Sequence, residues 1–228
     1  MARSSETLAR IPLFSNLPQA EVDRLDTQCV WLDHQPKQQI LHYNDEGTEV
    51  YFVVSGVVRV LIYSPKGKEV ILRDIKDGEF FGELAALDGR PRSASIVALT
   101  RAVVAKMPST VFRAAIHKHE SVCDQILELL TSQVRQLSHR VTEFSTLSVN
   151  DRIRSELLRL ARRRNDRSGD FVISPPPFHS ELAARVSTHR EAVTRELRTL
   201  ERDGIIEKRR GALVICDPAR LSALIEGD

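Results

Sequence analysis

The alternation of hydrophobic and polar residues divides the chain into a β-rich first part and a helical second part. Across residues 29–107, short runs of β-branched and aromatic residues alternate with turns rich in glycine, asparagine, aspartate and proline. The clearest runs are Tyr51–Val54, Val57–Tyr63 and Val70–Leu72, with two more strands expected within Ser95–Ala105. Strands of this length and spacing predict a barrel or jelly roll. A short helical segment, Leu13–Leu25, is expected to pack on it.

The pattern becomes helical between Pro108 and Leu147. Hydrophobic residues there step by four and three in alternation, at Cys123, Leu127, Leu130, Val134, Leu137, Val141 and Phe144. This is the a/d seam of a coiled coil, held over about three heptads. Ile126 and Leu129 form a second apolar stripe, expected to pack on the β-domain. A helix packed only on its own domain is the alternative, but two stripes favour a parallel homodimer through residues 119–147.

The last third of the chain predicts a compact arrangement of short helices and strands. The expected elements are a helix over 151–161, a polar loop over 162–170, a strand over 171–173, helices over 180–186 and 190–203, and a two-stranded hairpin over 205–215. Thr188 and Glu191, three residues apart, are typical of a capping box at the start of the last helix. Two helices joined by a tight turn form a helix-turn-helix, whose second helix enters the DNA major groove by its N-terminal residues.

Composition restricts the classes of protein. A chain of 228 residues can bury the cores of two modest domains, and 42% hydrophobic with 28% charged residues is typical of a globular protein. No run approaches the roughly 18 apolar residues of a membrane span, and no signal peptide is evident, so we expect a cytoplasmic protein without a membrane partner. Cys29, Cys123 and Cys216 lie far apart, which argues against a disulfide framework or a metal site.

The stretch Phe80–Ala94 has the residue types that an anionic, ribose-bearing ligand requires. Gly82 allows the backbone to approach an oxyanion and opens a helical turn whose free N–H groups favour negative charge. Glu83 can accept a hydrogen bond from a ribose hydroxyl, and Arg92 is a charge-assisted donor suited to phosphate oxygens. Each residue alone has an ordinary explanation, as a turn glycine or a surface charge. The ordered set within one short window indicates a phosphate site.

Two motifs carry a family resemblance. Gly-Glu-Leu-Ala, followed after a turn by Pro-Arg-Ser-Ala, resembles the phosphate-binding cassette of cyclic-nucleotide-binding domains. Residues 178–215 resemble the winged helix of CRP/FNR regulators, and Arg190-Glu191-x-x-x-Arg195 is similar to the recognition-helix motif of their cyclic-AMP receptor branch. The resemblance covers nearly the whole chain. It implies an α+β fold with a β-roll (jelly-roll-like) cyclic-nucleotide-binding domain over 1–118, a dimerisation helix over 119–147 and a winged helix-turn-helix domain over 148–228.

The resemblance implies cyclic AMP as the effector. The residues expected to contact it are Leu72, Arg73, Phe81, Gly82, Glu83, Leu84, Ala85, Arg92, Ser93, Ala94, Leu137 and Ser138. Leu137 stands where the best-known receptor has a threonine that meets the adenine amino group, and leucine cannot make that hydrogen bond. A site without a base-reading group discriminates poorly, so cyclic GMP stays open as a second effector. Gln133 replaces an arginine that would pair with Glu83, which predicts a weaker ribose contact.

The resemblance also implies a transcriptional regulator rather than an enzyme. Arg190 and Arg195 have the geometry for bidentate contact with guanine, and Glu191 can accept from a cytosine amino group. Branch members with this motif bind GTGA-type palindromes. Expected phosphate contacts come from Ser180, Thr188, Thr194 and Arg209. The implied partners are double-stranded DNA, a second copy of the chain and RNA polymerase, with ligand occupancy biasing the dimer between two arrangements of its DNA-binding heads.

Other functions stay open at this point. An iron–sulfur sensor of the same fold would need clustered cysteines, and a haem sensor could draw on His42, His117 or His119. A nucleotide-binding module that controls a protein partner would share the cassette but would not bind DNA. An enzyme is least favoured, because no nucleophile, base or metal set accompanies the phosphate-binding residues.

Overall fold

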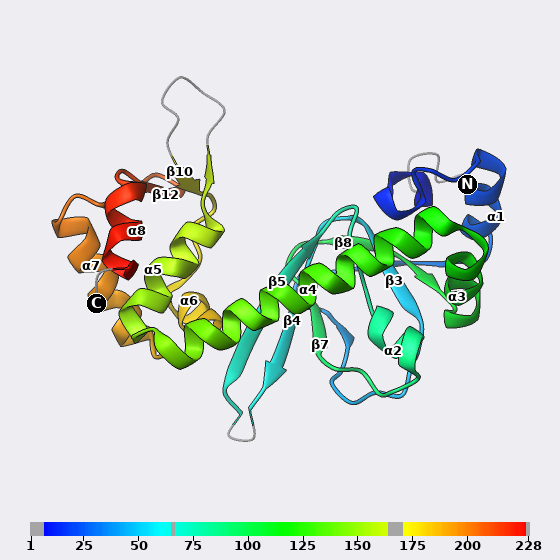
Figure 1. The fold of residues 1–228 in the computed structure, drawn as a ribbon, viewed down its shortest axis with the longest axis horizontal. Helices are drawn as coiled ribbons and strands as arrows, with labels where there is room; N and C mark the ends of the chain where they lie inside the picture. The colour runs from blue at the N-terminus through cyan, green and yellow to red at the C-terminus, as the bar shows by residue number, and fades with distance from the viewer. Residues whose placement is uncertain (1–6, 65–66, 164–170, 227–228) are drawn as a thin grey trace. The chain divides into compact units, whose positions relative to one another are not determined.

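The computed structural model describes residues 7–64, 67–163 and 171–226 (Figure 1). The described residues form two compact units, one within residues 7–64 and 71–134 and the other within residues 67–70, 135–163 and 171–226. Helix α4, Glu120–Thr146, contributes its first half to one unit and its second half to the other. Within the described ranges, no helix is long and apolar enough to cross a membrane.

The first unit is built on two four-stranded sheets, with strand orders β1-β8-β3-β6 and β2-β7-β4-β5. Before α4 the elements are η1 Leu8–Arg10, η2 Pro12–Phe14, α1 Gln19–Asp26, β1 Val30–His34, β2 Gln39–Leu41, β3 Val50–Ser55, β4 Val57–Tyr63, β5 Glu69–Lys76, β6 Phe80–Phe81, α2 Glu83–Asp88, β7 Ser95–Ala98, β8 Ala102–Met107 and α3 Ser109–Lys118. The strands expected from β-branched and aromatic runs are therefore present.

Strand β3 explains how the sheets are arranged, because it is buried on both faces. Side chains alternate along a strand, so Tyr51 and Val53 point one way and Phe52 the other. Tyr51 and Val53 enter a core that also contains Val58 of β4 and Ile96 of β7, so the two sheets pack face to face. Phe52 enters a second core shared with the N-terminal helices, α3 and α4. The predicted α+β fold with an N-terminal β-roll is confirmed.

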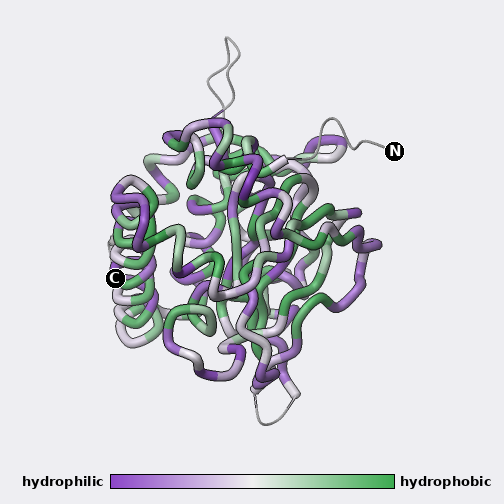
Figure 2. The backbone as a smooth tube through the Cα atoms, turned by 90° about the vertical axis from the view of Figure 1, so that its right-hand side faces the viewer, coloured by the Kyte–Doolittle hydropathy of each residue, from purple (hydrophilic) through white to green (hydrophobic). Residues whose placement is uncertain are grey.

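Helix α4 carries two apolar stripes, as its periodicity predicts. Ile126 is buried in the core of the β-roll and Leu129 packs against it. The seam residues behave differently, since Val134, Leu137 and Val141 are each more than 60% exposed in the single chain. Hydrophobic and hydrophilic residues alternate along the backbone (Figure 2). On α4 the seam residues beyond Leu130 remain exposed in the single chain.

The second unit contains a sheet of order β11-β12-β10-β9 packed with helices around one core. After α4 the elements are α5 Val149–Leu160, β9 Arg162–Arg163, β10 Phe171–Ile173, α6 His179–Arg185, α7 Arg190–Arg202, β11 Ile206–Arg209, β12 Ala212–Ile215 and α8 Pro218–Glu226. The predicted helix-turn-helix and hairpin are present. Strand β9 occupies the start of the predicted polar loop, and residues 164–170 lie outside the described residues.

The predicted capping box at the recognition helix is wrong. Helix α7 begins at Arg190 with His189 as its N-cap, and no side chain caps it. Thr188 lies one residue earlier, where its N–H donates to the Ala183 carbonyl at 2.9 Å and its side chain is buried. The turn that ends α6 therefore points Thr188 into the protein, and Glu191 lies at the wrong spacing from the true cap.

Candidate functional site

The backbone at Gly82 forms one wall of the predicted cassette, between β6 and α2. Gly82 has φ 86°, in the left-handed region that favours glycine. A Cβ there would lie 2.6 Å from Nη1 of Arg92 and 2.8 Å from the carbonyl oxygen of Glu49. Glycine is thus needed both for the backbone conformation and for the close approach of the arginine.

Arg92 is held in place by main-chain acceptors. Its Nη1 donates to the Gly82 carbonyl at 3.1 Å and its Nη2 to the Glu49 carbonyl at 2.8 Å. The guanidinium carbon lies 5.7 Å from the centre of the Tyr51 ring, within cation–π range. The side chain is only 3% exposed, and burial lowers the pKa of Arg92 from its ordinary value.

Nε of Arg92 is buried and finds no acceptor among the described residues. A guanidinium has five N–H donors, and a buried donor without a partner costs about 1 to 3 kcal/mol. The cassette thus holds a cation with unused hydrogen-bonding capacity. Because this nitrogen is buried, a phosphate oxygen could supply the missing acceptor only after the side chains around it move.

Glu83 starts α2 and is buried. Gln133 of α4 donates from Nε2 to Oε1 of Glu83 at 3.4 Å, which is long for a hydrogen bond. Gln133 therefore contacts the cassette glutamate from the position at which the family resemblance implies an arginine, and the bond that it makes is weak.

The other predicted ligand residues divide into three groups. The first group consists of cassette residues. Phe81 and Ala85 are buried beside Gly82, whereas Leu84 is exposed on α2. Ser93 and Ala94 directly follow Arg92, so these residues lie together around Gly82 and Arg92. On β5, Leu72 and Arg73 point to opposite faces of the strand and cannot both face one ligand from within it; Arg73 shares its face with the core residue Ile75. Leu137 and Ser138 lie on the exposed half of α4 that belongs to the second unit.

The first turns of α7 present the predicted base-contacting residues. Arg190, Glu191 and Arg195 are exposed, and a period of 3.6 residues places all three within one half of the helix surface. The predicted phosphate contacts are less uniform. Ser180 is exposed and Arg209 pairs with Glu207 at 2.7 Å. The side chain of Thr188 is buried, at 7% exposed.

Thr194 is engaged within the helix-turn-helix. Its hydroxyl donates to the Arg190 carbonyl at 2.9 Å and lies 2.7 Å from Nδ1 of His179, the first residue of α6. This contact joins the two helices of the motif. Burial, together with the charges of Lys208, Arg190 and Arg198, lowers the pKa of His179.

Comparison with known proteins assigns the β-roll and the helix-turn-helix unit to two known domain families. Residues 32–119 match the cyclic nucleotide-binding domain, and residues 151–224 match the Crp-like helix-turn-helix domain. The chain is 25% identical over 218 residues to the CRP-like cAMP-activated global transcriptional regulator of Mycobacterium tuberculosis, across 95% of this chain and 97% of that protein. The chain belongs to the CRP/FNR family. It is accordingly a transcriptional regulator with a cyclic nucleotide-binding domain, and not an enzyme.

Further CRP/FNR relatives agree with this assignment. The cAMP-activated global transcriptional regulator CRP of Salmonella typhimurium is 28% identical over 190 residues, covering 83% of this chain and 90% of that protein. The crystal structure of a CRP/FNR-family transcriptional regulator from Thermus thermophilus superposes with a TM-score of 0.68 at 25% identity, over 87% of this chain and 99% of that one. CRP/FNR regulators bind DNA through the helix-turn-helix and form dimers.

A buried charge network in the second unit of this CRP/FNR chain was not predicted. Glu156 of α5 is 3% exposed and accepts from Arg140 of α4 at 3.0 Å. Arg159 forms an ion pair with the same carboxylate, and Arg185 of α6 lies 3.7 Å from its other oxygen. Arg140 also donates to the Arg185 carbonyl at 2.7 Å. The network ties α4, α5 and α6 together, and a sequence signal existed, because Glu156 falls three residues after core residue Ile153.

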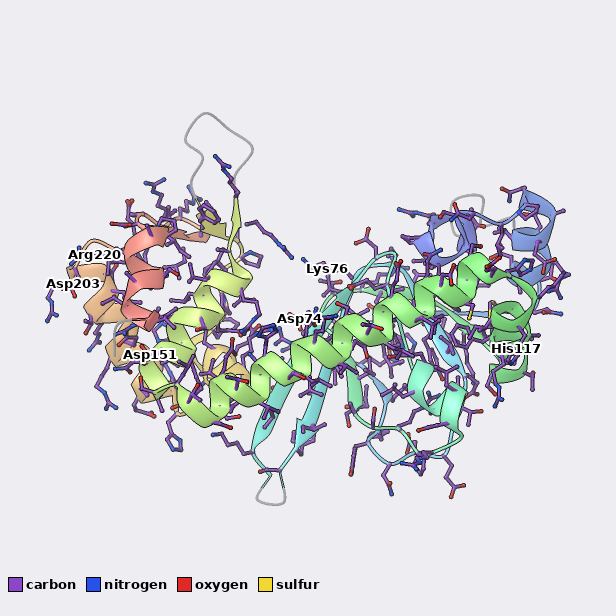
Figure 3. The ribbon with its side chains drawn as sticks, in the orientation of Figure 1. Asp74, Lys76, His117, Asp151, Asp203 and Arg220 are labelled. Atoms are coloured by element: carbon purple, nitrogen blue, oxygen red, sulfur yellow. The ribbon has the colours of Figure 1, made fainter. Side chains whose placement is uncertain are left out.

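A second network fixes the recognition helix. Arg154 of α5 donates to Glu196 of α7 and to Asp151 at 2.7 Å each, and to the Leu224 carbonyl of α8 at 3.0 Å. Asp151, labelled in Figure 3, also contacts the α5 N-cap Ser148. Helix α8 was not predicted, although Asp217 accepts from the Arg220 N–H ahead of its first turn and Pro218 starts it, a usual helix-start signal.

Proposed function

We propose that the protein is a homodimeric regulator that binds cyclic AMP at the cassette and then binds a GTGA-type palindrome. The observation that carries the proposal is Arg92, buried against Gly82 with an unfilled donor. A cyclic phosphate would complete its hydrogen bonds, with the ribose at Glu83. The relatives described above are named as cAMP-activated, which supports cyclic AMP as the effector.

Cyclic GMP is a further candidate effector, because Leu137 has no hydrogen-bonding group with which to read the base. Calorimetric titration with each nucleotide, followed by a mobility shift on a GTGA palindrome, tests the proposal. Binding of cyclic AMP alone supports a conventional receptor, and binding of both supports relaxed base selection. If neither nucleotide binds, the proposal is wrong.

We propose that dimerisation uses the exposed seam of α4, within residues 119–147. Val134→Lys should weaken the dimer, because burying an unpaired ammonium group in an apolar seam costs several kcal/mol per chain. Sedimentation equilibrium measures the change in dimer dissociation constant. Ser132→Lys is the matched control, since Ser132 lies on the same helix opposite the seam and is exposed. Equal dissociation constants for the two variants would place the interface elsewhere.

We propose that Arg190, Glu191 and Arg195 read bases and that Ser180, Thr194 and Arg209 support phosphate contacts. In a dimer, two recognition helices would lie about 34 Å apart, in successive major grooves. Arg190→Ala should relax discrimination at one guanine by about 1 to 3 kcal/mol, measured by competition with single-base variants of the palindrome. Arg209→Ala, at a phosphate contact, should weaken all sequences alike. Equal losses on specific and random DNA for Arg190→Ala would count against base reading.

Ligand control would then run through α4, which contributes to both units. A ligand changes DNA affinity only if it binds the two arrangements of the dimer differently. We propose functional segments of 1–118 for ligand binding, 119–147 for dimerisation and 148–228 for DNA binding, with RNA polymerase as the partner at the promoter.

A further inference from the structure

A carboxylate lies directly beside the buried arginine of the cassette. Oε2 of Glu49 is 3.4 Å from Nη2 of Arg92, and its Oε1 is 2.6 Å from Nζ of Lys106. The side chains of Glu49 and Lys106 are about a third exposed, at 30% and 33%, so the pair borders solvent next to the cassette. The Lys106 ammonium lowers the pKa of Glu49, which is therefore ionised at neutral pH.

The fold places these charges together from distant parts of the sequence. Strands β3 and β8 pair antiparallel with Tyr51 opposite Lys106, and Glu49 precedes Tyr51 by two residues. Positions two apart share a face of an extended chain, so Glu49, Tyr51 and Lys106 point the same way, towards Arg92. A Cβ at Gly47 would lie 2.9 Å from Oε2 of Glu49 and 3.5 Å from Nη2 of Arg92, so the preceding loop also closes on this cluster.

The charge of this cluster suits a ligand with a single negative charge. Arg92 and Lys106 are cations and Glu49 is an anion, and the charges of Asp45 and Glu83 also act on Arg92, so carboxylates surround the cation. A cyclic phosphodiester carries one negative charge, so these carboxylates repel it less than they repel a doubly charged ligand. A phosphomonoester carries about −1.5 to −2 at neutral pH, and its second charge would face Glu49 without a cation to balance it. The repulsion from Glu49 grows in proportion to the ligand's charge.

We propose that Glu49 is a specificity-determining residue that favours singly charged cyclic phosphodiesters over doubly charged phosphomonoesters. The inference rests on the proposed function, in which the ligand phosphate lies at Arg92. Sequence motifs place Glu83, Arg92 and Ser93 at the ligand but assign no role to Glu49 or Lys106. Glu49 would thus distinguish a cyclic nucleotide from its own hydrolysis product, which differs by one broken P–O bond and one added charge.

The test compares cyclic AMP with 5′-AMP by calorimetric titration of the full-length protein. Glu49→Gln keeps the shape of the side chain and removes its charge. The repulsion energy between Glu49 and the ligand is proportional to the ligand's charge. Removing the Glu49 charge should therefore raise the affinity for cyclic AMP roughly threefold and the affinity for 5′-AMP roughly tenfold. The ratio of the affinity for cyclic AMP to the affinity for 5′-AMP should therefore fall about threefold. Equal gains for both ligands, or no gain in a variant that still melts cooperatively, would overturn the inference.

Lys106→Met provides the matched opposite change. It removes a positive charge, so the affinities should fall and that for 5′-AMP should fall further. The double variant Glu49→Gln/Lys106→Met restores the net charge and should return selectivity close to that of the wild type. Selectivity unchanged in Lys106→Met would contradict the proposal even if Glu49→Gln failed to fold. If the wild type binds neither cyclic AMP nor cyclic GMP, the proposed function fails, and that result is distinct from an unchanged ratio in the variants.

Discussion

Arg92→Ala should lower the affinity for cyclic AMP by about 2 to 5 kcal/mol, or roughly thirtyfold to several thousandfold. Truncating one partner of a buried, charge-assisted contact leaves the phosphate without its main cation. The same change removes hydrogen bonds to the carbonyl oxygens of Gly82 and Glu49, so the variant should also melt at a lower temperature. Calorimetric titration measures the first effect and thermal unfolding the second.

Arg90→Ala is the matched control for Arg92→Ala. Arg90 lies two residues away in the same loop, but its side chain is 83% exposed and its contact with Asp88 is long, at 3.9 Å. Its removal should leave the affinity for cyclic AMP within about twofold of the wild-type value, because exposed charges on flexible side chains contribute little to binding. A loss of affinity shared equally by both variants would mean that the loop's total charge, and not the buried guanidinium, attracts the ligand.

Glu156→Ala should destabilise the second unit by about 3 to 5 kcal/mol. Glu156 is 3% exposed and pairs with three arginines, of which Arg185 is itself buried. Removing the carboxylate leaves those cations close together without their counter-ion. We expect faster hydrogen exchange in α5 and α6 and weaker DNA binding, with the β-roll amides protected as in the wild type.

Glu201→Ala tests whether the destabilisation expected for Glu156→Ala is due to the burial of its ion pairs. Glu201 of α7 also forms a short ion pair, 2.7 Å to Lys208, but both side chains are substantially exposed. An exposed pair contributes about 0 to 1 kcal/mol, so hydrogen exchange should change little. If Glu201→Ala and Glu156→Ala accelerated exchange equally, the buried network would not be what holds α5 and α6 in place.

The features that could be predicted from the sequence are those in which hydrophobic residues recur at regular, short spacings. The seam of α4 repeats every three or four residues, and β3 reads as a continuous apolar run, so each carries its own signal. The cassette was recognisable because its residues fall within a single turn-rich window. Leu72 and Arg73, expected at the ligand from outside this window, lie next to each other on β5, so their side chains face opposite ways.

The features that were missed depend on contacts between distant segments. Glu49 and Lys106 meet only because β3 pairs with β8, and neither residue belongs to a local motif. Arg92 was expected at the ligand, but its burial against backbone carbonyls follows from the approach of Glu49 and Gly82. Glu156 and Arg185 come within 3.7 Å of each other only once α5 and α6 are packed together, so their pairing carries no local signal.

The close approach at Gly82 has a genetic consequence. Every missense change in a glycine codon adds at least a Cβ, and a Cβ at this position would collide with Nη1 of Arg92 at 2.6 Å. A single nucleotide substitution could therefore displace the guanidinium without touching the helix-turn-helix or the seam of α4. A genetic selection for variants that no longer respond to the effector should therefore recover substitutions at codon 82. The variant proteins should still accumulate in the cell.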